Sequence, residues 1–249
     1  MAKGTVYVVT GASRGLGLEL VKQLLGRGNT VVAAVRSPST SQGLQTLQHE
    51  HPKELSFVTM DTSDEASIKA AGEALEKDKP GGIDVLINNA GVSGKGRYRP
   101  IEQDIQDFKD IMAVNILGPY LVVRALLPLI RKGRKKQIFN MSSGLASMGN
   151  LAANLRGEGI YQFAASYGLA YRASKAALCM ETLSLAADLK PEGITVVSMD
   201  PGWVRTDMGG PTADIEAPES IAGQLKVYDA VTEEDTGKFY KYDGSIVPF

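Results

Sequence analysis

The 249-residue sequence has a single cysteine, Cys179, so it can form no internal disulfide, which fits a reducing compartment. Neither sign of charge dominates, because 27 basic and 28 acidic residues leave a formal net charge of −1. This balance gives no electrostatic reason to expect nucleic acid or an anionic membrane as a partner. The N-terminus lacks the charged, apolar and small-residue segments of a secretory signal. We predict a cytoplasmic protein and expect no metal site.

Long uninterrupted apolar runs are also missing. The most apolar stretch, Ile111–Ile130, contains Asn115, Pro119 and Arg124. A core-facing helix explains it better than a membrane span, in which polar and charged residues are costly. The length suits one large α/β domain or two small ones, and we predict a single domain over residues 1–249.

A glycine-rich turn stands near the start of the chain. An apolar strand, Val6–Val9, runs into TGASRGLG at Thr10–Gly17, and a helical pattern follows to Leu25. Glycines allow a sharp turn and a close approach to a ligand, and the unpaired N–H groups of the helix start favour a diphosphate. We predict a dinucleotide site rather than an ordinary surface turn. Its expected contacts are Gly11, Ser13, Arg14, Gly15, Leu16 and Gly17.

The second predicted strand, Thr30–Val35, indicates which dinucleotide binds. In dinucleotide folds an acid at the end of this strand binds the ribose 2′-hydroxyl of NAD. Here the next residue is Arg36, which together with Arg14 could hold a 2′-phosphate. We therefore predict NADP(H), with two solvated surface arginines as the alternative.

Two further strands end in polar or small residues. Leu55–Met60 is followed by Asp61 and Thr62, which could meet the adenine, although Asp61 could equally cap the next helix. Ile83–Ile87 runs into Asn88–Gly91, whose small side chains leave room for a cofactor. The asparagines could also tie neighbouring strands together. The predicted cofactor contacts in this second stretch are Asn89, Ala90 and Gly91.

The motifs TGASRGLG, NNAG and YRASK occur in that order, and together they resemble the short-chain dehydrogenase/reductase family over nearly the whole chain. The phrases YRASKAAL and PGWVRTDMGG are most similar to its sniffer and C-factor branch. The resemblance implies one Rossmann-type domain, a nicotinamide cofactor and a catalytic tetrad. In this sequence the tetrad corresponds to Asn115, Ser143, Tyr171 and Lys175.

Asn115 lies inside a helical pattern from about residue 103 to residue 131. Pro119, four residues on, has no N–H to give to the Asn115 carbonyl, which must find another donor. By resemblance this carbonyl holds a water in the proton path. A simple kink is the competing interpretation.

Ser143 follows the predicted strand Gln137–Ser142, and by resemblance it polarises the substrate carbonyl, with Ser142 as the alternative. Ser143 and Tyr171 are 28 positions apart, about twice the family spacing. We therefore predict an insertion at about 145–168 beside the active site, acting as a lid, a pocket wall or an oligomer contact, for example in a homodimer.

Tyr171 and Lys175 are four positions apart and share one helix face. A nearby ammonium favours the phenolate, so the pKa of Tyr171 is expected to fall from roughly 10 towards neutrality. Tyr171 could then donate a proton to a carbonyl or accept one from an alcohol. Tyr167 is a weaker candidate because no lysine stands four residues after it. By resemblance both Tyr171 and Lys175 also contact the cofactor.

The loop after the sixth predicted strand, Ile194–Met199, faces the nicotinamide by resemblance, although it could be an ordinary proline turn. Its expected cofactor contacts are Pro201, Gly202, Val204 and Thr206.

We predict a doubly wound, mostly parallel α/β sheet of Rossmann type with helices on both faces and strand order 3-2-1-4-5-6-7. The predicted activity is NADP(H)-dependent reduction of small or aromatic aldehydes, ketones or quinones. The alternatives are a hydroxysteroid or other secondary-alcohol dehydrogenase and a non-catalytic, NADPH-sensing regulator.

Overall fold

The computed structural model describes residues 4–96, 98–158 and 167–249. One seven-stranded parallel sheet has the spatial order β3-β2-β1-β4-β5-β6-β9, which confirms the predicted order with β9 in seventh place. Its strands are β1 (Val6–Thr10), β2 (Thr30–Val35), β3 (Leu55–Thr59), β4 (Val85–Asn88), β5 (Gln137–Met141), β6 (Thr195–Asp200) and β9 (Phe239–Lys241).

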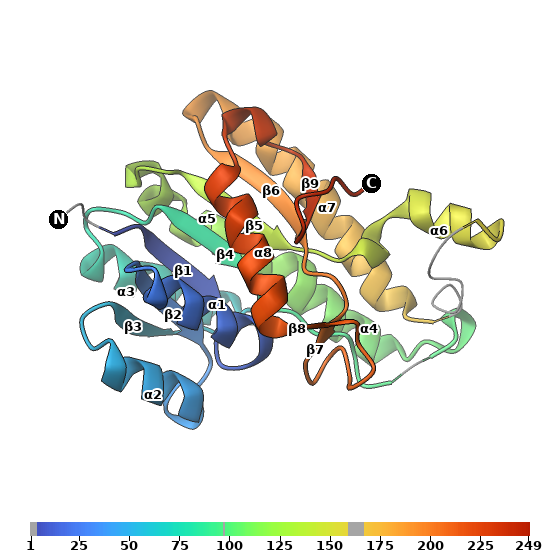
Figure 1. Cartoon of the computed structure of the whole chain (residues 1–249), viewed down its shortest axis with the longest axis horizontal. Helices are drawn as coiled ribbons and strands as arrows, with labels where there is room; N and C mark the ends of the chain where they lie inside the picture. Colours follow the sequence, from blue (N-terminus) through green and yellow to red (C-terminus); the bar gives the residue numbers. More distant parts are fainter. Residues whose placement is uncertain (1–3, 97, 159–166) are drawn as a thin grey trace.

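Helices cover both faces of this sheet (Figure 1). Those whose buried residues pack on one face are α1 (Gly15–Gly26), α2 (Gln42–Glu50) and α8 (Ala217–Ala230). Those on the other face are α3 (Glu65–Asp78), α5 (Gly118–Lys132) and α7 (Leu169–Leu189). The chain is therefore the predicted three-layer α/β fold in one domain.

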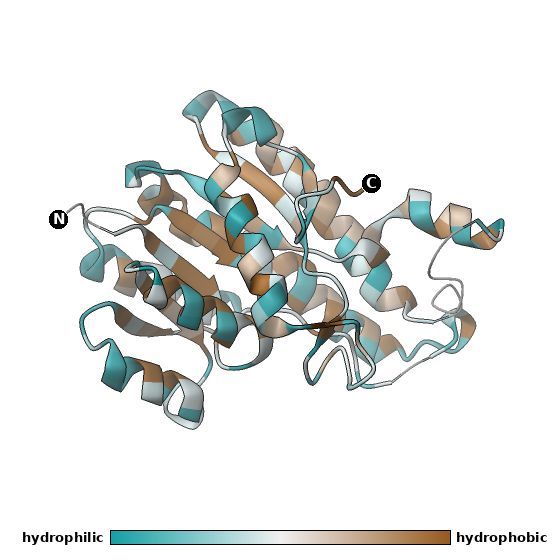
Figure 2. Ribbon diagram, viewed as in Figure 1, coloured by the Kyte–Doolittle hydropathy of each residue, from teal (hydrophilic) through white to brown (hydrophobic). Residues whose placement is uncertain are grey.

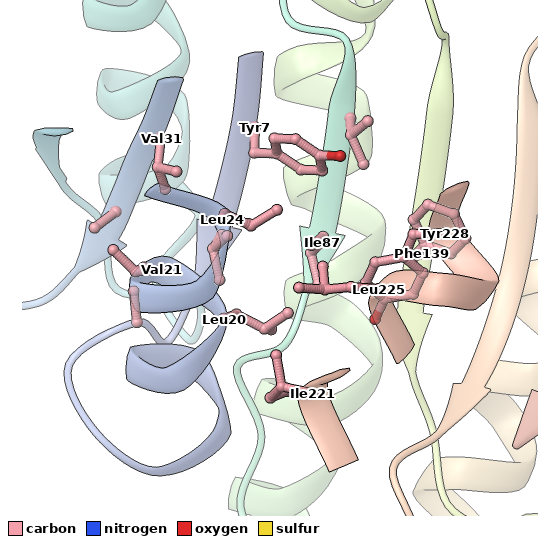
Figure 3. Packing of buried hydrophobic residues seen from close by; sticks show 14 of the residues in the cluster. Tyr7, Leu20, Val21, Leu24, Val31, Ile87, Phe139, Ile221, Leu225 and Tyr228 are labelled. Atoms are coloured by element: carbon pink, nitrogen blue, oxygen red, sulfur yellow. The ribbon is translucent and has the colours of Figure 1, made fainter. Parts of the chain in front are cut away.

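The strands are apolar throughout because both of their faces are buried. In β1, Tyr7 and Val9 join the core under α1 and α8, whereas Val8 joins the core under α3 and α5. Figure 2 shows the sheet as the most hydrophobic layer. Figure 3 shows Leu20 of α1 and Leu225 of α8 packed over the same face of the sheet.

The apolar stretch forms one helical run, Ile105–Lys132, that is long and apolar enough to cross a membrane by length and composition. It consists of α4 (Ile105–Met112), a π-helical turn (Ala113–Leu117) and α5. Val122, Leu126 and Ile130 are buried in the core shared with α3. These contacts support the predicted core-facing helix.

Four short elements were not predicted. The helix α2 has a polar sequence, QGLQTLQHE, and shows its inward face only through Leu44 and Leu47. The two-residue strands β7 (Val204–Arg205) and β8 (Ile215–Glu216) pair with each other and are too short for a periodic pattern. Helix α6 (Met148–Leu155) begins the predicted insertion and lies at one end of the molecule (Figure 1). Residues 159–166 of that segment, including Tyr161 and Phe163, lie outside the described residues.

Candidate active site

The glycine turn after β1 is shaped for close backbone approach. Gly11 and Gly15 have φ angles of 64° and 55°, in the left-handed region that favours glycine. A Cβ atom on Gly17 would lie 2.3 Å from the Gly11 carbonyl oxygen and 2.6 Å from Asn89 Nδ2. The turn therefore requires glycine at its bends and at its contact with the loop after β4.

Helix α1 begins directly at this turn with an extended Arg14 as its N-cap. No side chain of the described residues caps it, and its first ladder bond runs from Leu18 N–H to the Arg14 carbonyl. The first-turn N–H groups therefore stay available, and together with the helix dipole they favour an anionic group. Ser13 and Leu16 hold the turn in place, since the Ser13 carbonyl accepts from Ser41 Oγ at 2.7 Å and Leu16 packs against the core. The site fits the diphosphate of a dinucleotide.

Arg14 and Arg36 are both exposed. Arg14 forms an ion pair with Asp207 (Nη1 to Oδ2, 3.3 Å), a partner that the sequence did not predict. Hydrogen bonds from Ser63 hold the pKa of Asp61 below its usual range, and the nearby charge of Arg36 lowers it further. Arg36 therefore lies close to Asp61 at the end of β3.

Asp61 is a turn residue rather than a helix cap. Its Oδ1 accepts from Ser63 N at 2.9 Å and from Ser63 Oγ at 2.7 Å, whereas the N-cap of α3 is Asp64. The Thr62 backbone packs against Gly118, where a Cβ atom would lie 2.6 Å from the Thr62 carbonyl oxygen. The cap interpretation of Asp61 is therefore wrong.

The asparagines after β4 tie strands together, as the alternative interpretation proposed. Asn88 Nδ2 donates to Asn140 Oδ1 in β5 at 2.9 Å, and Asn89 Nδ2 donates to the Thr10 carbonyl at 2.9 Å. The Ala90 N–H donates to Thr10 Oγ1 at 3.0 Å. These bonds fix the backbone that leads into Gly91.

Gly91 borders the predicted tetrad. A Cβ atom at this position would lie 3.3 Å from Asn115 Oδ1 and 3.4 Å from Lys175 Nζ. A larger residue would therefore crowd both groups.

Asn115 is fully buried in the π-helical turn. The N–H of Gly118 reaches back five residues to the Ala113 carbonyl, and Pro119 follows it without an N–H of its own. The Asn115 side chain accepts from Val92 N and donates to the Val92 carbonyl, both at 2.9 Å. It also donates to Ser174 Oγ at 3.0 Å, so it ties the loop after β4 to α7.

Ser143 and Ser142 have different surroundings. The Ser143 side chain lies next to the Tyr171 phenol and acts to lower the pKa of that group. Ser142 is buried, and its hydroxyl donates to the Lys175 carbonyl at 3.2 Å and contacts Cys179 Sγ at 3.1 Å. The geometry thus brings Ser143, and not Ser142, to the tyrosine.

Lys175 lies under the Tyr171 ring, with its Nζ 5.8 Å from the ring centroid. Lys175 is 4% exposed, and its ammonium donates to the Met141 carbonyl at 2.6 Å. Burial lowers the pKa of Lys175 to about 8. A protonated, anchored lysine therefore stands one helical turn from the phenol.

The predicted fall in the Tyr171 pKa is wrong for this structure. Burial raises the pKa of Tyr171 to about 12, and the negative charge of Asp200 adds to this rise. The Ser143 side chain acts in the opposite direction. The Lys175 ammonium contacts the Met141 carbonyl instead of the phenol oxygen. Desolvation of the phenolate is therefore the largest cause of the rise, although Tyr171 is half-buried and not fully buried.

The loop after β6 meets the glycine turn. Gly202 has a φ of 79°, and the methyl group of Thr206 lies 3.6 Å from the Cβ position of Gly15. Val204 is buried in β7, and the Pro201 carbonyl accepts from Ser220 Oγ of α8 at 2.6 Å. The structure thus places the opening turn and this loop side by side at the carboxyl edge of the sheet.

A family model described as enoyl-(acyl carrier protein) reductase matches residues 11–242. The chain belongs to the short-chain dehydrogenase/reductase family. C-signal from Myxococcus xanthus is 44% identical over 169 residues, which are 68% of this chain and 94% of that protein. This short-chain dehydrogenase/reductase is therefore an oxidoreductase, and the predicted family is confirmed.

Two solved structures are similar to this short-chain dehydrogenase/reductase over nearly its whole length. An NADPH-bound carbonyl reductase from chicken fatty liver is 33% identical with a TM-score of 0.87, over 99% of this chain and 100% of that one. The carbonyl reductase Sniffer of D. melanogaster is 30% identical with a TM-score of 0.88, over the same shares of the two chains. The similarity to the sniffer and C-factor branch is thereby confirmed.

Sequence reasoning missed Asp200 and Ser174. Asp200 ends β6, where polar residues of a doubly wound sheet face the ligand edge, and this position was a usable signal. Ser174 donates to the Tyr171 carbonyl at 2.7 Å and accepts from Asn115, but its letter in YRASK carries no such information. Tyr167 is 46% exposed, in keeping with the preference for Tyr171.

Glu181 of α7 gives a stability prediction. Both of its carboxyl oxygens are buried without a hydrogen-bond partner in the described part of the chain, and burial raises its pKa to about 8. The unfolded chain loses this proton near pH 4.3, so the free energy of unfolding should fall as the pH rises from there to about 8, by up to about 1.4 kcal/mol per unit. Denaturant titrations at several pH values should show that Glu181→Gln removes this slope. The exposed Glu219→Gln is the control, and an unchanged slope in Glu181→Gln would contradict the assignment.

Proposed function

We propose that this short-chain dehydrogenase/reductase reduces the carbonyl group of small or aromatic aldehydes, ketones or quinones with NADPH. The observation that carries the proposal is the meeting of three groups: the Ser143 side chain acts on the Tyr171 phenol, and the Lys175 ammonium lies 5.8 Å from the Tyr171 ring centroid. These groups lie at the carboxyl edge of the sheet, the usual ligand site of doubly wound folds.

The nicotinamide, when bound, supplies the hydride. The Ser143 hydroxyl orients and polarises the substrate carbonyl, and Tyr171 gives its phenolic proton to the carbonyl oxygen. The anchored Lys175 ammonium faces the same space as Gly91 and holds the cofactor ribose. Asn115 binds the loop after β4 through Val92 and helix α7 through Ser174, so it fixes the position of one relative to the other. It also completes the proposed proton path.

The protonated state of Tyr171 agrees with carbonyl reduction. A phenol whose pKa is about 12 keeps its proton near neutral pH, which suits a donor. Alcohol oxidation needs the phenolate as acceptor, which burial disfavours. This supports carbonyl reduction over the alternative of a secondary-alcohol dehydrogenase. The proposed cytoplasmic location, where NADPH is the abundant reductant, also agrees with reduction.

The choice of NADP(H) is supported by two exposed cations at the adenosine end of the site. Arg14 belongs to the glycine turn, and Arg36 follows β2 where NAD-binding folds have an acid. Guanidinium groups bind phosphate through paired, charge-assisted hydrogen bonds. The carbonyl reductase from chicken fatty liver, which is similar over its whole length, has NADPH bound. The expected remaining contacts are those of the glycine turn, of residues 61–62 and 89–91, and of the loop after β6.

The segment at about 145–168 is proposed to contact the substrate. It starts directly after the Ser143–Gly144 pair, continues into α6 at Met148, and ends just before Tyr171. Both of its ends are therefore held next to the groups proposed to act on the carbonyl.

A signalling role is the second candidate, because one relative with 44% identity is named C-signal. A panel of aldehydes, ketones, quinones and steroids with NADPH and with NADH separates the candidates. We expect carbonyl-dependent oxidation of NADPH with at least one class and a much slower reaction with NADH. Cofactor binding without turnover of any carbonyl would favour the signalling role, and preferential oxidation of alcohols with NADP⁺ would favour the dehydrogenase.

A further inference from the structure

Asp200 is a buried carboxylate between two loops of the candidate site. It is the last residue of β6, 8% exposed, and it directly precedes Pro201 and Gly202. On its other side runs the loop that follows β5, with Ser143 and Gly144. A charge at this depth is costly unless hydrogen bonds compensate for the lost water.

The carboxylate contacts the backbone of both loops. The N–H of Gly202 donates to Asp200 Oδ1 at 3.1 Å, and the Gly144 backbone amide acts to lower the pKa of the same carboxyl group. The contact with Gly144 is so close that a Cβ atom there would lie 2.9 Å from Asp200 Oδ2. Asp200 therefore sets the distance between Gly144, which follows Ser143, and the loop after β6.

The charge of Asp200 also acts on the tyrosine. Burial raises the pKa of Asp200 itself, and its negative charge contributes to the raised pKa of Tyr171. The other ionisable groups that interact with it are Cys179 of α7, Lys241 of β9 and Asp243 of the following turn. Lys241 and Asp243 form an ion pair with each other at 3.3 Å.

We propose that Asp200 is a positioning residue that holds the loop after β5 that carries Ser143 (the serine loop) to the loop after β6. The proposal rests on the reductase function proposed above. It adds a residue outside the tetrad, acting through the Gly144 and Gly202 amides and through its charge.

Asp200→Asn tests both parts. Asparagine keeps one acceptor oxygen but turns an amide NH₂ towards the second N–H group, so one bond is lost together with the charge. We expect kcat for carbonyl reduction to fall about tenfold through misplacement of Ser143. Because reduction needs the protonated phenol, we expect the alkaline limb of the kcat profile to move about half a unit or more to lower pH.

Two readouts need no cofactor. Hydrogen exchange of the Gly144 and Gly202 amides should be faster in Asp200→Asn, and the tyrosinate absorbance lost in Tyr171→Phe should titrate at lower pH. The matched control is Asp243→Asn, which removes a carboxylate charge near Asp200 but touches neither loop and keeps the Oδ1 acceptor for Ser245. It should leave exchange and the pH profile unchanged.

Gly144→Ala separates positioning from charge and replaces the first variant if Asp200→Asn does not fold. Its methyl group would push the serine loop away from Asp200 while the charge remains. We expect a fall in kcat of about tenfold with the alkaline limb unmoved. Folded variants with parental kcat, pH profile and amide exchange would overturn the proposal. A parent that reduces no carbonyl while the amide and tyrosinate effects persist would instead refute the reductase function.

Discussion

Replacing Tyr171 by Phe is expected to lower kcat for carbonyl reduction by about a thousandfold, within the range of general acid catalysis. The substitution removes only the phenolic oxygen, which is proposed to donate the proton and lies next to Ser143. The ring that packs over Lys175 remains. The measurement is NADPH oxidation under saturating carbonyl substrate.

Binding of NADPH to Tyr171→Phe, followed by cofactor fluorescence, should stay within about twofold of the parent, because the glycine turn is untouched. Tyr120→Phe is the matched control, since Tyr120 lies on α5, outside both the tetrad and the segment at about 145–168, and is 40% exposed. It should keep parental turnover. A Tyr171→Phe enzyme with more than about a tenth of parental kcat would overthrow the assigned role.

Replacing Arg36 by Asp is expected to weaken NADPH binding by about a hundredfold or more, which corresponds to roughly 2.7 kcal/mol. The change removes a cation proposed to hold the 2′-phosphate and puts an anion beside Asp61, which already feels the Arg36 charge. The affinity for NADH, which lacks this phosphate, should stay unchanged or increase. Titration of both coenzymes into the parent and the variant measures the switch.

The exposed Lys22→Asp on α1 makes the same charge reversal away from the glycine turn and should leave both affinities near parental values. Equal affinity of the parent for NADPH and NADH would refute the coenzyme preference. A loss of both coenzymes in Arg36→Asp would point to damage of the site instead of a lost phosphate contact.

The strands and their order were predictable because each carries its own local signal. The runs Val6–Val9 and Thr30–Val35 are apolar because both of their faces are buried, and the right-handed crossover rule then restricts their order. The glycine turn was predictable for the same reason, since its spacing is local. Its contact with Asn89, however, joins residues far apart in the chain.

The charge state of the site was not predictable from spacing. Lys175 lies four positions after Tyr171, and this spacing correctly placed the ammonium under the ring. The pKa of the phenol also depends on burial and on Asp200, which arrives from β6. The spacing of two residues in the sequence shows neither the burial of the phenol nor the charge of Asp200. The predicted fall in the Tyr171 pKa was therefore wrong.

The choice between Ser142 and Ser143 also depended on tertiary structure. Adjacent residues of an extended strand point to opposite faces, so only one hydroxyl can reach Tyr171. The resemblance indicated Ser143, and the structure gives the reason, since Ser142 is turned towards Cys179. The roles of the tetrad in catalysis remain predictions for the variants above.

Transfer of the hydride is the most direct test of the central claim, which is that this chain delivers a hydride from NADPH to a carbonyl carbon. The parent enzyme is incubated with NADPH that carries deuterium at the transferable position of the nicotinamide and with the best substrate of the panel. Mass spectrometry of the product alcohol should find deuterium on the former carbonyl carbon, and Tyr171→Phe should give almost none. An unlabelled alcohol, or no alcohol from any carbonyl despite tight NADPH binding, would contradict the account.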